Sequence, residues 1–260
     1  MNMENEDWRV WDEEKEYGDV FFKRATGSLP EMESSKAAAK AVNKIISDQD
    51  SLLDVGCGTG HYLKSLISGV DKSFSYTGAD ATGYYIELAT KAWSGVADSN
   101  ENVLSVKFKQ ADIFNLPFED QYADVVMCNN VLLHLPSVAT PIQELIRTAK
   151  KYVVIRALIG NSTFRTKQVH EPEVFDENGE PENFHFYNIY SENYISSLLN
   201  GNDCVKSFSF SSDTDYNVDN ITKSMTDYSE EPTDITTIVN GMQVNNYIIQ
   251  PWQFLIIEIK

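Results

Sequence analysis

A glycine-rich turn between an apolar run and a helical segment constrains the fold of this chain more than any other feature. The run "SLLDVG" is typical of a buried strand, and the segment "GHYLKSLISGV", which starts at Gly60, is typical of a helix. Gly56, Gly58 and Gly60 occupy every second position between them. Because glycine has no side chain, such a turn lets a ligand lie directly against the backbone. The spacing therefore predicts a strand–turn–helix unit with a ligand on the turn.

Strand-like and helix-like segments alternate from this turn up to Gly160. Alternation with short connections predicts a parallel sheet that has helices on both faces. Later in the chain, a helix "SENYISSLLNG" and a strand "VKSFSFS" resume the pattern, and "WQFLIIEIK" closes it as a buried strand. The other strands are expected at residues 74–80, 104–112, 124–128 and 151–160.

The charge of the chain limits its partners. Its net charge is −18, whereas nucleic-acid-binding proteins usually present a basic face. No apolar run approaches the ~20 residues that span a bilayer, and the N-terminus is acidic where a secretory signal is basic and then apolar. The three cysteines are far apart, which gives neither a disulfide framework nor a metal-ligand spacing. We expect a cytoplasmic protein with no nucleic-acid partner, no membrane partner and no metal.

Three acids near the ends of successive strands indicate which ligand the turn binds. Asp54 lies inside the first strand motif, Asp80 ends the second strand, and Asp112 ends the third. Carboxylates there suit a ribose, an adenine amino group and a positive charge, but they suit a pyrophosphate badly. His61 stands where a dinucleotide-binding turn has its third glycine, and a P-loop lysine is missing. The pattern favours S-adenosylmethionine, which carries a sulfonium and an ammonium.

Simpler interpretations of the same residues stay open. An alternating glycine turn also serves strand–helix packing, and Asp80 is also explained as a turn acid. Asp112 is explained as a helix cap as well, because aspartate is a favoured N-cap residue.

Four segments resemble the successive motifs of class I S-adenosylmethionine-dependent methyltransferases. They are "LLDVGCGTGHY", "YTGAD", "FKQADIFNLPF" and "ADVVMCNNVLLHLP", and they cover about residues 50–160. The resemblance implies an α/β, Rossmann-like sheet of seven strands with helices on both faces. Six strands are parallel, and the last strand, antiparallel, lies between the fifth and the sixth. It also implies a lead-in at residues 1–48, a cofactor-binding core at 49–160, an acceptor-side insertion at 161–190 and a C-terminal part of the core at 191–260 with an inserted segment at about 212–250.

The same resemblance assigns residues to the cofactor. The glycines pass beneath its methionyl part, Asp54 lies near its ammonium, and Asn129 brings a backbone carbonyl to the same group. Arg24 is a candidate for its carboxylate. The full expected set is Arg24, Asp54, Gly56, Gly58, Gly60, Asp80 and Ala81 at the ribose, Asp112 and Ile113 at the adenine, and Asn129.

Histidines are the candidates for a general base, which is needed only if the acceptor loses a proton. His134 follows the fourth strand, and shaping the pocket is its alternative role. His170 and His185 lie in the segment that covers the acceptor in many relatives.

Positive charge in an acidic chain points to an anionic acceptor. An arginine in an apolar strand, Arg156, needs a partner, which is either an internal carboxylate or an acceptor phosphate or carboxylate. Arg165 and Lys167 follow it, and Tyr187 is a further candidate that also suits the core. The segments "NGMQVNNYIIQPWQF" and "MESSKAAAK" resemble a narrower set of methyltransferases found with capsule and cell-surface polysaccharide genes.

These observations predict O-methylation of a small anionic metabolite or polysaccharide precursor. One alternative is a non-catalytic protein that keeps the fold and binds the cofactor. The other is an NAD(P)-dependent oxidoreductase, against which His61 and Asp112 count.

Overall fold

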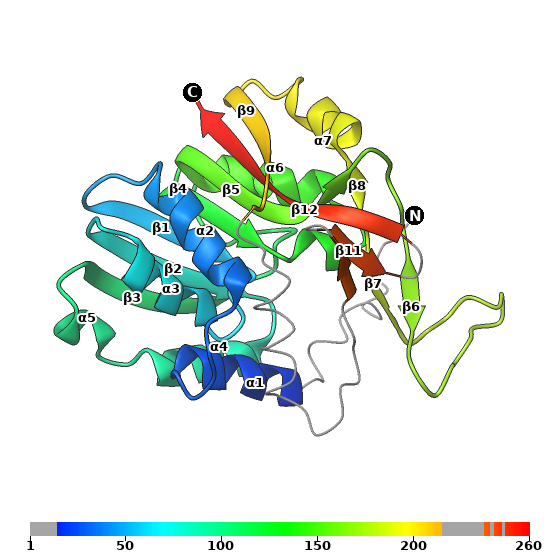
Figure 1. The fold of residues 1–260 in the computed structure, drawn as a ribbon, viewed down its shortest axis with the longest axis horizontal. Coiled ribbons are helices and arrows are strands. Elements are labelled where there is room, and N and C mark those ends of the chain that lie inside the picture. Colours follow the sequence, from blue (N-terminus) through cyan, green and yellow to red (C-terminus); the bar gives the residue numbers. More distant parts are fainter. Residues whose placement is uncertain (1–14, 215–236, 240–241, 246–247) are drawn as a thin grey trace.

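The computed structural model describes residues 15–214, 237–239, 242–245 and 248–260 (Figure 1). All candidate site residues named above fall within this part of the chain. Residues 1–14 of the predicted lead-in and part of the predicted insertion at 212–250 lie outside the described residues. The boundaries proposed for the domains stay predictions.

A central sheet of long strands has the order β3-β2-β1-β4-β5-β12-β9 (Figure 1). Strand β12 is antiparallel to both of its neighbours, and the other adjacent pairs are parallel. This confirms the predicted fold, including the last strand between the fifth and the sixth. The bounds are β1 Asp50–Val55, β2 Phe74–Asp80, β3 Val103–Gln110, β4 Ala123–Asn129, β5 Ala149–Gly160, β9 Val205–Ser212 and β12 Ile248–Ile259.

Short strands extend this sheet. Strands β10 (Thr237–Val239) and β11 (Met242–Asn245) continue it beyond β12, and β8 (Tyr190–Ser191) pairs with the end of β5. Strands β6 (Lys167–Val169) and β7 (Phe184–Phe186) form a separate antiparallel hairpin that projects away from the sheet (Figure 1). The hairpin occupies the middle of the segment expected to cover an acceptor.

Helices cover both faces of the sheet. On one face, α2 (Glu33–Asn43) and α3 (His61–Gly69) pack on a core that includes Leu52 and Met127. On the other face, α6 (Ala139–Thr148) and α7 (Glu192–Leu199) pack on a second core. The strands between them are apolar on both sides for this reason, and every residue of β4 except Asp124 is buried.

Two helices lie beside β3, in the segment between β2 and β3. The segment divides into α4 (Gly83–Ala92) and α5 (Val96–Ser99). Gly95 separates them with a φ of +75°, a left-handed conformation that a continuous helix does not contain. Helix α1 (Lys15–Ala25) packs against α4 and α3.

The carboxyl ends of the parallel strands meet at one edge of the sheet. The glycine turn follows β1, Asn129 ends β4, and the segment leading to the β6–β7 hairpin follows β5. The point between β1 and β4, where the strand order reverses, is the usual ligand position in such sheets. The prediction that Asp112 ends β3 was wrong, because β3 ends at Gln110. Ala111 still donates its N–H to the carbonyl of Asp80, and the chain turns at Asp112.

None of the helices in the described ranges has the length and the apolar character needed to span a membrane. In the same part of the chain, no cluster of histidine, cysteine and acidic side chains could hold a metal ion.

Candidate active site

The glycine turn has the conformation that its sequence requires. Gly56, Gly58 and Gly60 have φ angles of +78°, +54° and +72°, which residues with a Cβ adopt at a cost. A Cβ at Gly56 would lie 2.2 Å from Cγ2 of Val131. The N–H of Gly56 donates to the carbonyl of Ala79 at 2.7 Å, which fixes the turn to β2. The backbone at Gly56 therefore has no room for a side chain.

Asp80 holds this turn from the end of β2. Its Oδ2 accepts the N–H of Gly58 at 2.8 Å, and its Oδ1 accepts the N–H of Thr82 at 3.0 Å. These contacts fit the interpretation as a turn acid. Each carboxylate oxygen accepts two hydrogen bonds, so these contacts are compatible with ribose hydroxyls as further donors. The ribose contact stays a prediction, as does that of Ala81, whose carbonyl accepts from Nε2 of Gln110 at 2.8 Å.

Asp54 is a buried carboxyl group with an altered protonation equilibrium. Burial raises its pKa to about 7; the hydrogen bond from Tyr76 opposes this shift, and the negative charge of Asp80 adds to it. The Tyr76 hydroxyl donates to Oδ2 of Asp54 at 2.7 Å. A cation bound nearby would favour the ionised form and lower this pKa. The contact of Asp54 with the ammonium of the expected cofactor stays a prediction.

Asn129 is a buried amide at the end of β4. Its side chain is 6% exposed, and neither its Oδ1 nor its Nδ2 has a hydrogen-bond partner within the described part of the chain. A buried polar group without a partner costs about 1–3 kcal/mol. It lies at the carboxyl end of β4, in the strand next to β1. The sequence predicted a role for its backbone carbonyl and missed its side chain.

The loop after β3, where adenine is expected, combines an exposed acid with a buried apolar residue. Asp112 is exposed, and its Oδ1 accepts the N–H of Phe114 at 2.9 Å, which closes a local turn. No helix lies between β3 and β4, a segment that the structure describes in full, so the helix-cap alternative is wrong. Ile113 is buried. Both residues have the position that the motif predicts, and their contact with adenine stays a prediction.

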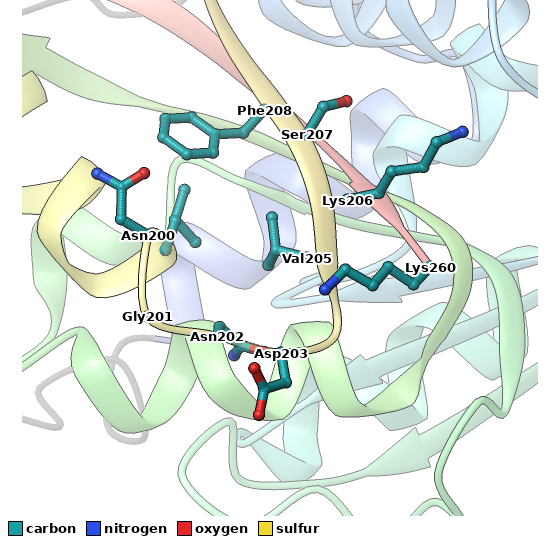
Figure 2. Close-up of a pocket in the computed structure, with 10 residues that line it drawn as sticks. Asn200, Gly201, Asn202, Asp203, Val205, Lys206, Ser207, Phe208 and Lys260 are labelled. Atoms are coloured by element: carbon teal, nitrogen blue, oxygen red, sulfur yellow. The ribbon is translucent and has the colours of Figure 1, made fainter.

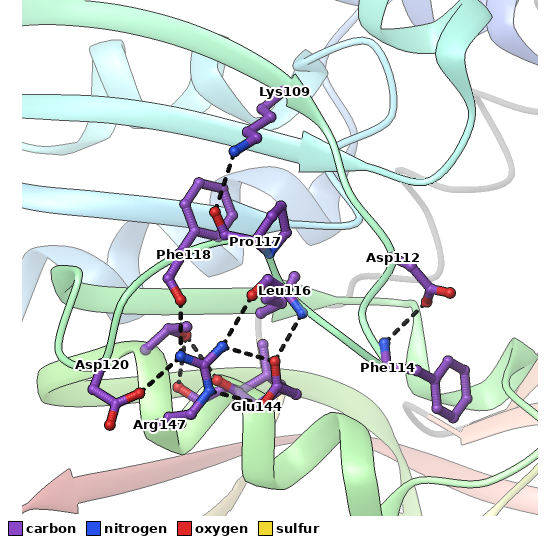
Figure 3. A network of polar contacts seen from close by, with 11 residues as sticks. Lys109, Asp112, Phe114, Leu116, Pro117, Phe118, Asp120, Glu144 and Arg147 are labelled. Atoms are coloured by element: carbon purple, nitrogen blue, oxygen red, sulfur yellow. Dashed lines mark hydrogen bonds and ion pairs between the residues drawn. The ribbon is translucent and has the colours of Figure 1, made fainter.

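Arg147 of α6 fixes this loop (Figure 3). Its guanidinium donates to the carbonyls of Phe118 at 2.8 Å and Leu116 at 3.0 Å. It also forms a bidentate pair with Glu144, with both contacts at 2.8 Å. Oε2 of Glu144 in turn accepts the N–H of Leu116 at 2.7 Å. The Arg147–Glu144 pair therefore sets the backbone position of the loop after β3, a role that was not predicted from the sequence.

Helix α1 brings Arg24 to the other side of the glycine turn. The ring of Phe21 stacks on that of His61 with centroids 4.2 Å apart. Burial and the charge of Arg24 lower the pKa of His61 to about 3. Arg24 also donates to the carbonyl of Pro30 at 3.0 Å. Its predicted contact with the cofactor carboxylate stays a prediction.

Arg156 has the internal carboxylate partner that the sequence left open. Its Nε and one terminal nitrogen each lie 2.7 Å from Oδ2 of Asp213, and its other terminal nitrogen donates to Oδ1 of Asn130 at 2.6 Å. Its guanidinium also lies 4.2 Å from the ring centroid of Trp252. The side chain is 1% exposed. An acceptor contact of Arg156 stays a prediction, and Asp213 was not anticipated.

The remaining basic candidates lie on or beside the β6–β7 hairpin. Lys167 pairs with Glu180 at 2.8 Å. Arg165 donates from Nε to Oδ1 of Asn188 at 3.1 Å and from a terminal nitrogen to the carbonyl of Pro136. No ion pair of Arg165 is present among the described residues, so its charge is not neutralised there by a neighbouring carboxylate.

The tertiary structure brings the predicted histidines together. Nδ1 of His134 lies 3.1 Å from the carbonyl oxygen of Phe186. Nδ1 of His185 lies 2.8 Å from Nε2 of His170. The rings of His134 and His185 have centroids 6.2 Å apart, and the ring of Tyr187 lies 6.0 Å from that of His134. Four residues predicted separately therefore form one cluster.

A separate pocket lies at the opposite edge of the sheet (Figure 2). It has a volume of about 530 Å³ and is lined by the start of β9, the preceding loop and Lys260. The start of β9 lies at the amino-terminal end of the parallel strands, and Lys260 directly follows antiparallel β12, so the pocket is remote from the glycine turn. None of the predicted site residues lines it.

Comparison with known sequences gives a family. The profile of a methyltransferase domain matches residues 46–189, which is more than half of the chain. A demethylmenaquinone methyltransferase of Lactobacillus johnsonii is 31% identical over 101 residues, or 39% of this chain and 40% of that protein. A sterol 24-C-methyltransferase of Gibberella zeae is 30% identical over 100 residues, or 38% of this chain and 24% of that protein. The chain thus spans less than half the length of these curated relatives.

Solved structures share the fold at lower identity. A protein of Methanosarcina mazei described as a SAM-dependent methyltransferase has a TM-score of 0.51 at 19% identity, over 85% of this chain and 96% of that one. The [4+2]-cyclase SpnF has a TM-score of 0.54 at 15% identity, over 86% of this chain and 80% of that one. At these identities the likeness concerns the fold alone.

Proposed function

This chain belongs to the methyltransferase-domain family, and from that premise we propose that it transfers a methyl group from S-adenosylmethionine to a small-molecule acceptor. The observation that carries the proposal is the buried amide of Asn129, unpartnered within the described residues and next to a glycine turn that admits no side chain. The turn would hold the methionyl part, with Asp54 near the ammonium. Asp80 would take the ribose, and Asp112 would take the adenine.

The chemistry divides between the cofactor and the chain. Bound S-adenosylmethionine supplies a methyl carbon attached to a positively charged sulfur, which is a good leaving group. The residues of the chain then need to place an acceptor atom ~3–3.5 Å from that carbon and to exclude water. Burial of Asn129 and Asp54 beside the turn supplies such a water-poor environment.

We propose further that the acceptor is anionic and is methylated at oxygen. Arg165 supports this proposal, because its guanidinium is held by Asn188 and Pro136 rather than by a carboxylate. Two of its nitrogens are thereby oriented, and an arginine binds phosphate or carboxylate with two parallel hydrogen bonds. The histidine cluster nearby suits a hydroxyl acceptor, which loses a proton on methylation.

The test is product formation. The protein is incubated with methyl-labelled S-adenosylmethionine and a panel of sugar phosphates, sugar acids and the corresponding neutral sugars, and labelled products are found by mass spectrometry. We expect labelled product from the charged members only. Arg165→Ala should raise the KM for such an acceptor about 10–100-fold, in line with the loss of a charged hydrogen bond. Lys206→Ala, whose partner is Glu258 on the remote part of the sheet, is the matched control.

Two results would contradict the proposal. Preferential methylation of the neutral sugars would reject the anionic acceptor. Binding of S-adenosylmethionine by calorimetry without any labelled product would favour a non-catalytic protein or another reaction on the same fold, such as that named for SpnF. Stronger binding of NAD than of S-adenosylmethionine would reject the methyl donor itself.

A further inference from the structure

The histidine cluster at the carboxyl edge of the sheet allows roles to be assigned to its members. We propose that His185 is the base that takes the proton of the acceptor hydroxyl, that His170 stabilises the protonated His185, and that His134 positions both by holding the hairpin. The inference rests on the proposed function and specifies its acceptor as a group that loses a proton during transfer.

The pair on the hairpin is a direct contact between two imidazoles. His185 lies on β7, and His170 follows β6, where its N–H donates to the carbonyl of Asn183 on the approach to β7. Their nitrogens Nδ1 and Nε2 are 2.8 Å apart, so one of them donates a proton to the other. When Nδ1 of His185 is the donor, its Nε2 bears no proton and is basic. His170 then orients the ring, as a carboxylate or carbonyl does for other catalytic histidines.

His134 is suited to positioning rather than to proton transfer. A carbonyl accepts only, so Nδ1 of His134 donates to the carbonyl of Phe186 at 3.1 Å. Burial and the neighbouring His185 lower the pKa of His134 to about 4, although the Phe186 contact opposes this shift. The ring is therefore neutral at pH 7 and too weakly basic to retain a proton. Its hydrogen bond fixes the backbone immediately next to His185.

Two further contacts hold the hairpin in the same place. The N–H of Asn188 donates to the carbonyl of Leu133, and Nδ2 of Asn188 donates to the carbonyl of Leu135 at 2.9 Å. The segment around His134 is thus joined to the hairpin at three points. His134 follows Asn129, the last residue of β4, by only five positions. The histidine pair, which is joined to this segment, therefore lies at the same edge of the sheet as the glycine turn.

The proton transfer balances without any other reactant. A lone pair of the acceptor oxygen forms the new bond to the methyl carbon, and the carbon–sulfur bond electrons stay on sulfur. The hydroxyl proton passes to Nε2 of His185, which becomes an imidazolium. Its Nδ1–H then donates to neutral His170, and such charge-assisted hydrogen bonds are about twice as strong as neutral ones. The proton leaves to water when the product leaves.

Other titratable groups surround the pair and have to be separated from it in any pH study. The ring of His134 contacts the rings of His185 and Tyr187. Lys167, which pairs with Glu180, lies on β6, and Arg165 precedes that strand. Because burial lowers the pKa of His134 to about 4, the charge of His134 is constant over a pH profile recorded from pH 5 to 8.

The first experiment needs no acceptor. The chain has only four histidines, so their imidazole signals are assigned by NMR from single His→Asn variants of the whole protein. We expect the titrations of His170 and His185 to be coupled, so that His170→Asn shifts the midpoint of His185 and the reverse holds. We expect His134 to stay neutral down to about pH 5 with its proton on Nδ1. Independent titration of His170 and His185 would overturn the pair.

The second experiment uses the best acceptor of the panel described above. His185→Asn should lower kcat about 10²–10⁴-fold, flatten the dependence of kcat on pH, and leave the affinity for S-adenosylmethionine unchanged. His170→Gln offers an amide oxygen as the acceptor near the position of Nε2 but cannot take up a proton, so it should shift the pH profile. The double variant should be no slower than His185→Asn. His134→Asn keeps a donor near Nδ1 and should preserve kcat, whereas His134→Ala should lower it.

The outcomes separate this inference from the proposed function. Wild-type turnover and an unchanged pH profile in His185→Asn would reject the base while methyl transfer stands. A histidine pair that is coupled by NMR in a protein that forms no methylated product would reject the proposed function alone. Thermal unfolding of each variant distinguishes a lost fold from a lost base.

Discussion

Substitution of Gly56 by alanine tests the explanation of the glycine turn most directly. The new Cβ would lie 2.2 Å from Cγ2 of Val131, and the backbone φ of +78° would have to be kept by a residue that disfavours it. The left-handed conformation costs about 1–2 kcal/mol, and overpacking of a buried site costs about 1–3 kcal/mol. We therefore expect Gly56→Ala to lower the free energy of unfolding by about 2–5 kcal/mol.

The chain offers a matched control for the backbone contribution. Gly179 has a φ of +80° with no heavy atom within 4 Å of the position that a Cβ would take. Gly179→Ala should thus show the conformational cost of about 1–2 kcal/mol alone. The difference between the two variants measures the overlap with Val131. It is obtained from urea unfolding curves recorded by circular dichroism at the same pH and without cofactor.

A second substitution isolates the steric contribution. Val131→Ala removes the methyl group that the new Cβ would strike. In the Gly56→Ala background it should recover about 1 kcal/mol or more relative to the sum of the single effects, as expected for residues in contact. Equal destabilisation by Gly56→Ala and Gly179→Ala, or strict additivity in the double variant, would refute the reasoning that the turn is closed to side chains.

Three further predictions concern ionisable side chains. The pKa of Asp54 rises from 3.8 to about 7 on folding, so the folded protein binds this proton more tightly than the unfolded chain. The contribution of Asp54 to the free energy of unfolding is therefore greatest below pH 4 and is lost as the pH rises towards 7. Asp54→Asn should remove this loss, roughly 4 kcal/mol in full, seen as a smaller difference in urea midpoints between pH 5 and 8. Arg147→Met should weaken S-adenosylmethionine binding in calorimetry about tenfold with little change in kcat, because the adenine loop loses the donor to two of its carbonyls; an unchanged Kd would contradict this. Asp213→Asn should destabilise the protein by about 3–5 kcal/mol by leaving Arg156 buried and without its carboxylate, and a second change, Arg156→Met, should restore part of that loss in thermal unfolding.

The fold could be predicted from the sequence because its determinants are local. Strand and helix periods, the glycine spacing and the short connections are each contained within a few neighbouring residues. Right-handed crossovers between parallel strands then leave few topologies open. The separate β6–β7 hairpin and the short strand β8 were missed, since segments of two or three residues in a polar stretch carry too little periodicity.

The site could be predicted where motif and edge of the sheet coincide. The glycines, Asp80 and Asp112 were chosen as candidates because each stands at or just beyond the end of a strand, and parallel strands bring their carboxyl ends together. Their ligand contacts stay predictions. The side chain of Asn129 was missed. Its signal is the lack of hydrogen-bond partners within the described residues, which exists only once the neighbouring strands are packed around it.

The sequence by itself determined the methyltransferase fold and the turn on which the cofactor is expected to lie, since both depend on spacing along the chain. Only the tertiary structure decided which charges meet. It paired Arg156 with Asp213, and it brought His134 to a hairpin on which His170 and His185 contact each other. These contacts join residues far apart in the sequence, and a hydrogen bond or ion pair depends on distances of a few ångströms that no local pattern encodes.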